Sequence, residues 1–286
     1  MDVPQTIIDR ITGQLADIGA KPFFLCVSGS DAYGFSSENN SDVDVRGSFY
    51  FTNLTNMFIP PINRKLTITG EMKIDGLPYE WHLHEVMKFF EMVSNSNINV
   101  IDWIYSPTWV FDVPEFIGWS QMYLKEFARS QFSIKMVHCA IGWSKNMVVG
   151  NWGNPKKVLH SLRPLMSVLL YLKTDRYIID INALVLNFQM MYCRMGCQGD
   201  SDLIDHDDFQ MYHEIGGLVD ELIELKCNGY KVPLQLKNMC IDLHESLVKS
   251  VKLRQHRLRQ KDFDELTWRD VVADIRIKTI EHQHIN

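Results

Sequence analysis

The spacing of hydrophobic and polar residues divides the chain into a first part that mixes strands with helices and a second part that is helical. At the start, the apolar residues of 4–19 recur every three or four positions, which predicts an amphipathic helix. Four segments follow that have the short apolar runs or the alternation typical of β-strands. These segments are FFLCVSG (23–29), VDVRGSFYF (43–51), KLTIT (65–69) and PYEWHLH (78–84). From Glu85 the pattern is helical again, so the residues up to about 113 mix strands with helices.

After Pro114 the strand pattern largely disappears and helical spacing takes over. We expect helices near residues 115–130, 132–149, 155–174, 181–195, 207–228, 233–258 and 266–281. Pro164 lies inside one of them, and its missing N–H and its ring predict a kink or a break there. The sequence therefore predicts an α+β fold, with a small mixed-sheet head over residues 1–113 and an all-helical body over residues 114–286.

The composition is that of an ordinary globular protein, with 46% hydrophobic and 22% charged residues among 286. The formal net charge of -6 argues against a broad, non-specific nucleic-acid binder, although a local basic patch could still hold RNA or a nucleotide. No apolar run approaches the roughly 20 residues that span a bilayer, and the charged N-terminal segment is unlike a signal peptide. The six cysteines form no CxxC pair. We therefore expect a cytoplasmic protein with reduced thiols and no membrane segment.

Two aspartates carry the clearest chemical signal. Asp42 and Asp44 are two positions apart in an expected strand, so both carboxylates project from one face, while Val43 and Val45 point into a core. Adjacent negative charges repel each other, and a divalent cation between them offsets that cost. Paired carboxylates on one face are what a two-metal phosphoryl- or nucleotidyl-transfer site requires. Mg²⁺ suits such a site, because it binds one or two carboxylates together with substrate phosphates.

Gly29 and Ser30 end the strand that precedes these aspartates. A glycine lets the backbone approach a phosphate closely, and exposed N–H groups and the Ser30 hydroxyl can donate to phosphate oxygens. A helical turn and a polar loop, residues 34–42, then lead to the Asp-x-Asp strand. This order of elements predicts a phosphate cradle beside a metal site.

These residues resemble the signature of the DNA polymerase β-like nucleotidyltransferase superfamily. Eleven residues separate Ser30 from Asp42, which is within the spacing of that signature. More narrowly, GSDAYGFSSENNSDVDVRG (29–47) is similar to a motif of bacterial and phage nucleotidyltransferases, some of them linked to RNA repair. The resemblance covers roughly residues 23–172 and continues through LHEVMKFFEMVSNSNINVIDWIYSP (83–107), FSIK (132–135) and KKVLHSLRPL (156–165).

The resemblance implies a Mg²⁺-dependent nucleotidyltransferase of the bacterial or phage-infected cell. It would move NMP from an NTP, such as ATP, to a hydroxyl acceptor such as an RNA end. Two ions, Mg²⁺ or alternatively Mn²⁺, would be held by Asp42, Asp44 and a third carboxylate from a later strand. Glu80 is the candidate for that third position and for the base that takes the acceptor's proton, since it alternates with the inward residues Trp81 and Leu83.

The resemblance also implies a set of nucleotide contacts from both halves of the chain. Lys156, His160 and Arg163 fall at i, i+4 and i+7, which is one face of a helix, although the same spacing fits a plain solvated face. The full set of implied nucleotide-binding residues is Gly29, Ser30, Tyr33, Lys135, Lys156, His160 and Arg163.

Two departures from the family pattern leave other functions open. Asp31 stands where family members often carry Arg, and Glu80 stands where the third group is commonly Asp. These departures motivate a degenerate protein that only binds a nucleotide or RNA. A protein AMP-transferase of the antitoxin type, which would modify a protein hydroxyl, is a further alternative. The long helical body argues against it, because such proteins are usually minimal heads.

Overall fold

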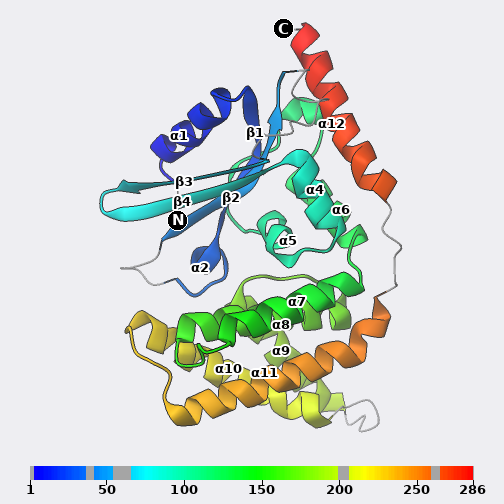
Figure 1. The fold of residues 1–286 in the computed structure, drawn as a ribbon. Helices are drawn as coiled ribbons and strands as arrows, with labels where there is room; N and C mark the ends of the chain where they lie inside the picture. Colours follow the sequence, from blue (N-terminus) through cyan, green and yellow to red (C-terminus); the bar gives the residue numbers. More distant parts are fainter. Residues whose placement is uncertain (1–2, 37–41, 54–65, 199–205, 259–264, 286) are drawn as a thin grey trace. The chain divides into compact units, whose positions relative to one another are not determined.

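The structure of the chain is a computed structural model and shows a mixed sheet with helices and a bundle of helices (Figure 1). The described residues are 3–36, 42–53, 66–198, 206–258 and 265–285. Part of the loop expected at 34–42, residues 37–41, lies outside them. The α+β fold expected from the sequence is confirmed.

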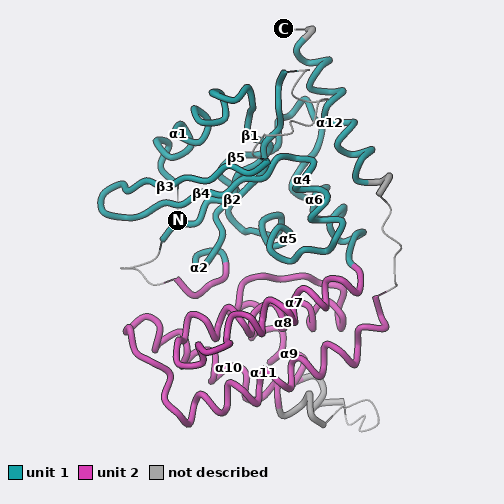
Figure 2. Tube along the Cα trace, viewed as in Figure 1, with its two compact units in different colours: residues 1–32, 38–132, 261–286 teal, residues 33–37, 133–260 magenta. Residues whose placement is uncertain are grey.

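The chain divides into two compact units (Figure 2). Unit 1 comprises residues 1–32, 38–132 and 261–286, and unit 2 comprises residues 33–37 and 133–260. The boundary expected near residue 113 therefore lies near residue 132 instead. The C-terminal helix, which was expected in the helical body, belongs to unit 1.

Among the described residues, unit 1 is built on a five-stranded sheet with strand order β3-β4-β2-β1-β5. Its strands are β1 (Ala20–Ser28), β2 (Val43–Phe51), β3 (Thr67–Ile74), β4 (Leu77–Glu85) and β5 (Trp109–Phe111). β2 and β4 run parallel, and the other neighbouring strands are antiparallel. The four strands expected from the sequence are confirmed. β5 was not expected, because three residues are too few to show an alternating pattern.

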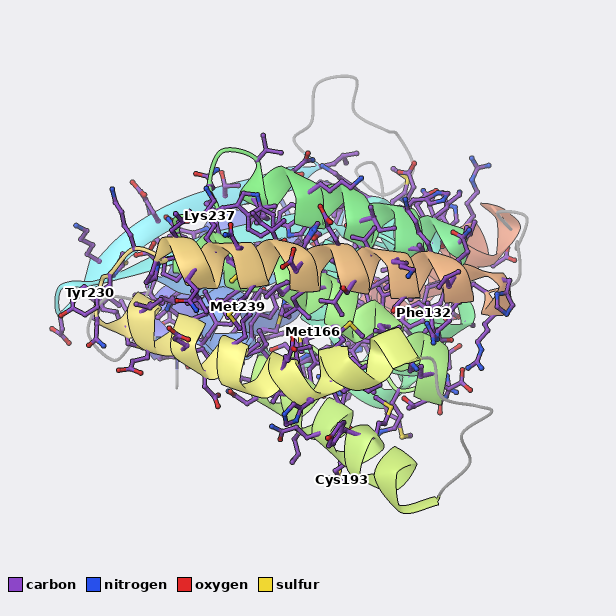
Figure 3. The ribbon with its side chains drawn as sticks, turned by 90° about the horizontal axis from the view of Figure 1, so that it is seen from below. Phe132, Met166, Cys193, Tyr230, Lys237 and Met239 are labelled. Atoms are coloured by element: carbon purple, nitrogen blue, oxygen red, sulfur yellow. The ribbon has the colours of Figure 1, made fainter. Side chains whose placement is uncertain are left out.

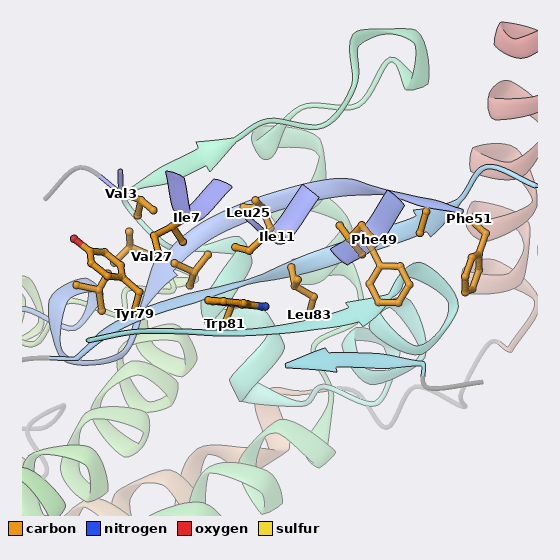
Figure 4. Packing of buried hydrophobic residues seen from close by; sticks show 14 residues of the cluster. Val3, Ile7, Ile11, Leu25, Val27, Phe49, Phe51, Tyr79, Trp81 and Leu83 are labelled. Atoms are coloured by element: carbon orange, nitrogen blue, oxygen red, sulfur yellow. The ribbon is translucent and has the colours of Figure 1, made fainter. Parts of the chain in front are cut away.

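One face of the sheet is apolar and packs against α1 (Gln5–Ala16), as Figure 4 shows. Ile7 and Ile11 of α1 are fully buried in one cluster with Val43 and Val45 of β2 and Trp81 of β4. Successive residues of a strand point to opposite faces. This core therefore turns Asp44, which lies between the two valines, toward the other face of the sheet.

Two helices that follow β4 pack on the second face of the sheet: α4 (Val86–Ser94) and α5 (Ile98–Ile104). The ring of Phe24 on β1 meets the ring of Phe89 on α4 edge to face, with 5.2 Å between centroids. The His84 ring on β4 stacks on Trp103 of α5, also at 5.2 Å. These aromatic contacts cover the part of this face near His84, while Glu80 remains exposed.

The C-terminal helix α12 (Glu265–Ile285) packs against unit 1. Lys278 Nζ donates to the carbonyl of Ile117 at 3.0 Å, and Gln283 Nε2 donates to that of Thr52 at 2.6 Å. The segment expected as one helix over 115–130 is η1 (Glu115–Ile117) followed by α6 (Gln121–Ser130), both of unit 1. These contacts are the physical reason that the expected division of the chain differs from the observed one.

Unit 2 is helical. Its elements are α7 (Ile134–Val148), α8 (Pro155–Thr174), α9 (Ile181–Gln198), α10 (His206–Cys227), α11 (Leu234–Arg254) and η3 (Gln255–Arg257). Of the kink or break expected at Pro164, a break is absent, because α8 continues through this residue. Pro164 is buried between the fully buried Leu162 and Leu165, and this packing offsets the hydrogen bond that proline removes. Of the helices in the described segments, none is both long and apolar enough to cross a membrane.

Candidate functional site

Gly29 lies where β1 ends and the short helix α2 (Gly29–Ala32) begins. Its φ of +68° falls in the left-handed region that favours glycine. A Cβ at this position would stand 1.9 Å from Oδ2 of Asp44. The backbone of Gly29 thus packs directly against the Asp44 carboxylate, and only glycine leaves room for it.

The register of the strands places Asp44 beside a second carboxylate. Asp44 of β2 pairs with Ser28 of β1 on one side and with Glu80 of β4 on the other. Neighbouring strands lie about 4.8 Å apart, so side chains at paired positions share a face and adjoin. The side chain of Asp44 is 25% exposed and Glu80 is exposed, so solvent reaches both. Glu71 of β3 stands opposite Glu80 and extends this row of acidic positions.

Asp42 lies one residue before β2 and is exposed. Its position two residues from Asp44 is the expected one, but it precedes the first paired residue of the strand. Over the part of the chain that the structure describes, no group of three or more His, Cys, Asp or Glu side chains stands ready to hold a metal ion. The structure therefore brings Asp44 and Glu80 to adjacent positions, but it does not gather the three expected carboxylates into one cluster.

Arg46 is a member of this site that the sequence reasoning missed. Its guanidinium forms an ion pair with the Asp44 carboxylate, and its Nη1 donates to the carbonyls of Glu80, at 3.4 Å, and Val45, at 3.2 Å. Arg46 thus links the carboxylate of β2 to the backbone of β4 next to Glu80. The signal for it was present, because Arg46 is two residues from Asp44 in the same strand and must share its face.

Two histidines continue this face of β4 away from Glu80. His82 is half-buried and pairs in register with Arg46, while His84 is buried, and its Nδ1 lies 3.1 Å from the Thr67 hydroxyl. Burial, together with positive neighbours such as Arg46 and Lys88, lowers the pKa of His82 and lowers that of His84 to about 3. Both rings are therefore neutral near pH 7 and serve as polar packing.

Ser30 and Asp31 follow Gly29 in the short helix α2, and their surroundings differ. Ser30, expected to donate to a phosphate, is only 5% exposed. Asp31 acts electrostatically on Tyr79, whose pKa is raised by burial first and by the charges of Asp75 and Asp31 after it. Tyr79 belongs to the apolar cluster, and Val43, its partner in register, lies on the face opposite Asp44. Asp31 is thus close enough to Tyr79, a residue of the other face, to act on its hydroxyl.

The chemistry of Asp44 and Glu80 fits a hard divalent cation such as Mg²⁺. Carboxylate oxygens are its preferred protein ligands, and two acidic positions side by side repel each other unless a cation intervenes. The absence of a side chain at Gly29 leaves room for the Asp44 carboxylate at this corner. Asp44 and Glu80, with Asp42 nearby in sequence, are the residues that would hold such an ion. The Arg46 guanidinium now occupies one oxygen of Asp44 and would have to share it.

Five of the predicted nucleotide contacts lie in unit 2, and three of these, Tyr33, His160 and Arg163, pack together there. The Arg163 guanidinium lies over the Tyr33 ring, 3.8 Å from its centroid, and Arg163 is only 1% exposed. The His160 ring contacts the rings of Tyr33 and Phe35 edge to face. Burial, reinforced by the positive charges of Arg163, Lys156, Lys157 and Lys226, lowers the pKa of His160 to about 3. Tyr33, His160 and Arg163 therefore form a packed cluster in this structure.

The other two predicted contacts, Lys135 and Lys156, are exposed. Lys135 lies in the first turn of α7 and Lys156 in the first turn of α8. Lys156 also lines a cavity within unit 2. A shared helix face therefore does not mean a shared environment, because Lys156 lies in solvent while Arg163, seven residues later, lies in the core.

Comparison with known proteins identifies a family for the chain. The sequence model of a family described as RlaP, RNA repair pathway DNA polymerase beta family, matches residues 6–181, which is more than half of the chain. Among curated proteins, no significant relative of the chain was found. Among solved structures, the chain is similar to a nucleotidyltransferase-like protein from Exiguobacterium sibiricum 255-15. The two are 14% identical, with 96% of this chain and 87% of that chain covered and a TM-score of 0.32, too low to support an argument about structure.

Proposed function

Because the chain belongs to the RNA repair pathway DNA polymerase beta family, we propose that it is a Mg²⁺-dependent nucleotidyltransferase that transfers NMP from an NTP to a hydroxyl at an RNA end. The observation that carries the proposal is the pairing of Asp44 with Glu80 across parallel strands, beside a glycine that cannot be replaced without displacing Asp44. The family supports nucleotidyl transfer in general. Mg²⁺ and the RNA acceptor are the specific content of the proposal.

The reaction is a substitution at the α-phosphorus of the NTP. The acceptor oxygen forms the new P–O bond, the bond between the α- and β-phosphates breaks, and pyrophosphate leaves. Bound Mg²⁺ supplies positive charge that stabilises the phosphates and makes the acceptor hydroxyl more acidic. Asp44 and Glu80 would hold the ions with Asp42, and the exposed Glu80 would accept the hydroxyl's proton.

Two other groups shape this site. The backbone of Gly29, which carries no side chain, would let the triphosphate come close to the chain beside Asp44. Arg46 orients the Asp44 carboxylate through their ion pair, and its positive charge would attract the phosphates. Ser30 contributes through its backbone N–H in this scheme, because its side chain is buried.

The proposal is tested by incubating the protein with each of the four α-³²P-labelled NTPs, total RNA and total protein, with Mg²⁺ or Mn²⁺. The expected result is label on RNA that depends on the divalent ion and is lost in EDTA. Label on protein instead would identify a protein AMP-transferase or a related enzyme. No label on either acceptor, with an intact fold by circular dichroism, would contradict nucleotidyl transfer.

One observation favours a second candidate, a protein that binds a nucleotide or RNA without turnover. Asp44 is held by Arg46, and over the described segments three metal-binding side chains are not gathered. Calorimetry separates the two functions. NTP binding that requires Mg²⁺, combined with no transfer in the acceptor screen, would favour the binding protein.

A further inference from the structure

Unit 2 contains a cavity of about 530 Å³ where the loop before α8 meets the loop after α10. Its lining includes Gly153, Asn154 and Lys156 from the first segment and Tyr230 and Lys231 from the second. The two loops are joined by a hydrogen bond from the Val232 N–H to the Gly153 carbonyl, at 3.1 Å. The cavity is therefore formed by residues that the fold holds together.

The lining is positively charged in an acidic protein. Three lysines line the cavity, Lys156, Lys226 and Lys231, and its lining includes no acidic residue, whereas the whole chain has a formal net charge of -6. The 20-residue helix α8 begins at this cavity, and the peptide dipoles of its N-terminal end add positive potential there. Positive charges from this region, including Lys156 and Lys226, contribute to the lowered pKa of His160. An anion is thus the ligand favoured by the charge.

An aromatic side chain lies at the same cavity. Tyr230 is 64% exposed, and Figure 3 labels it at the turn that joins α10 to α11. An exposed aromatic ring next to lysines is the combination by which proteins hold single-stranded nucleic acid, with a base stacked on the ring and phosphates near the cations. An acidic peptide would be attracted by the lysines, but it would have no base to stack on Tyr230.

We propose that this cavity is a binding site for single-stranded RNA, with backbone phosphates held by Lys156 and Lys231 and a base stacked on Tyr230. The choice of RNA rests on the proposed function, whereas the anion site stands on the cavity itself. Lys226 has a structural task as well, because its Nζ donates to the Phe35 carbonyl at 2.5 Å. Variants that leave Lys226 in place therefore test the proposal without disturbing that contact.

The test measures the affinity of a fluorescein-labelled 12-nucleotide RNA of mixed sequence by anisotropy, without NTP and in EDTA. At 0.1 M salt we expect the double variant Lys156→Gln, Lys231→Gln to bind the RNA at least about tenfold more weakly than the wild type. The negative slope of log binding constant against log salt concentration should become shallower by about 1.4. Tyr230→Leu should bind roughly tenfold more weakly with an unchanged salt slope.

The matched control is Lys157→Gln. Lys157 is the exposed neighbour of Lys156 in α8, carries the same charge and does not line the cavity. We expect it to change the affinity less than about twofold. Equal losses in Lys157→Gln and Lys156→Gln would mean a non-specific charge effect and would overturn the proposal.

Two competitors identify the ligand class. ATP or polyglutamate that binds as tightly as the RNA, and that loses affinity in the double variant to the same extent, would overturn the assignment to RNA. The binding assay needs no catalysis, so it is repeated with Asp44→Asn, which should retain RNA binding. If the wild type binds RNA but shows no nucleotidyl transfer, the cavity is supported and only the proposed function is contradicted.

Discussion

Two groups of residues were singled out by sequence for the same nucleotide, and the structure treats them differently. In unit 1, Asp44 and Glu80 occupy paired strand positions on a face that solvent reaches. In unit 2, Tyr33, His160 and Arg163 pack against one another, and Arg163 is almost completely buried. The first group is available for chemistry, while the second stabilises its own unit.

The difference follows from what surrounds each face. The opposite face of β2 and β4 is fully used by the core under α1, so the alternation of the strands commits Asp44 and Glu80 to the other side. A helix such as α8 can be covered on more than one side, and 14 of its 20 residues are buried. Helical spacing alone does not reveal which face remains exposed. The following variants test whether the two groups differ in this way.

The largest effect is expected from Asp44→Asn in unit 1. Removing the carboxylate charge that would hold the metal should reduce label transfer at least about 10³-fold. The partly exposed position and the similar size of asparagine should leave the thermal unfolding midpoint within about 2 °C. A fall in the midpoint as large as that of a core variant would instead make Asp44 a structural residue.

Arg163→Ala in unit 2 should act mainly on stability. The guanidinium is buried against the Tyr33 ring, so its removal should lower the free energy of unfolding by about 3 kcal/mol in urea titrations. The control is Arg176→Ala, which removes an exposed arginine and should change stability by less than about 0.5 kcal/mol. Unchanged stability combined with a raised KM for NTP would make Arg163 a ligand of the substrate and remove the contrast.

Gly29→Ala joins the two kinds of effect in one residue. The positive φ costs about 1–2 kcal/mol for alanine, and the added methyl group displaces the Asp44 carboxylate. We expect Gly29→Ala to lose this amount of stability and to transfer the label up to about 10²-fold more slowly. Gly118 has a similar positive φ but nothing within 4 Å of an added Cβ, so Gly118→Ala should lose stability without losing activity.

A pH dependence of stability is expected in unit 2. The pKa of His160 is about 3 in the folded chain, against an ordinary value of 6.5. Because the folded value is lower, the unfolded chain binds more protons between these values, and the free energy of unfolding falls as the pH drops below about 6.5. The slope from this residue is at most about 1.4 kcal/mol per pH unit.

His160→Phe keeps an aromatic ring and removes the titration, so its stability should depend less on pH between 6.5 and 4 than that of the wild type. His84, with a pKa of about 3, and His244, with a pKa of about 4, add the same trend to both proteins. The comparison is therefore between the two curves. The exposed His138 provides the control variant His138→Gln, and an equal flattening in that variant would refute the assignment to His160.

Much of the fold of unit 1 could be predicted because strand alternation is a local signal. The bounds of β2 are those expected, and the facing of Asp44 and Glu80 follows from that alternation alone. The return of α12 to unit 1 could not be predicted, because it depends on contacts such as that of Lys278 with Ile117, far apart in sequence. The continuity of α8 through Pro164 also depends on tertiary packing that overrides a local preference.

The candidate site was predictable to a similar degree. Motif spacing identified Gly29 and Asp44, and the structure places them in contact. The ion pair of Arg46 with Asp44 was missed, although its position in the strand contained the information. The burial of Ser30 and Arg163 could not be read from spacing, because it depends on which elements pack over them.

The central claim, that the pairing of Asp44 with Glu80 defines the catalytic site, is tested most directly by Glu80→Gln against Glu71→Gln in the label-transfer assay. Both are exposed glutamates at directly opposed positions of β4 and β3, but only Glu80 also pairs with Asp44. We predict that Glu80→Gln lowers the transfer rate by at least about 10²-fold and that Glu71→Gln changes it by less than about threefold. Equal rates in the two variants would contradict the claim.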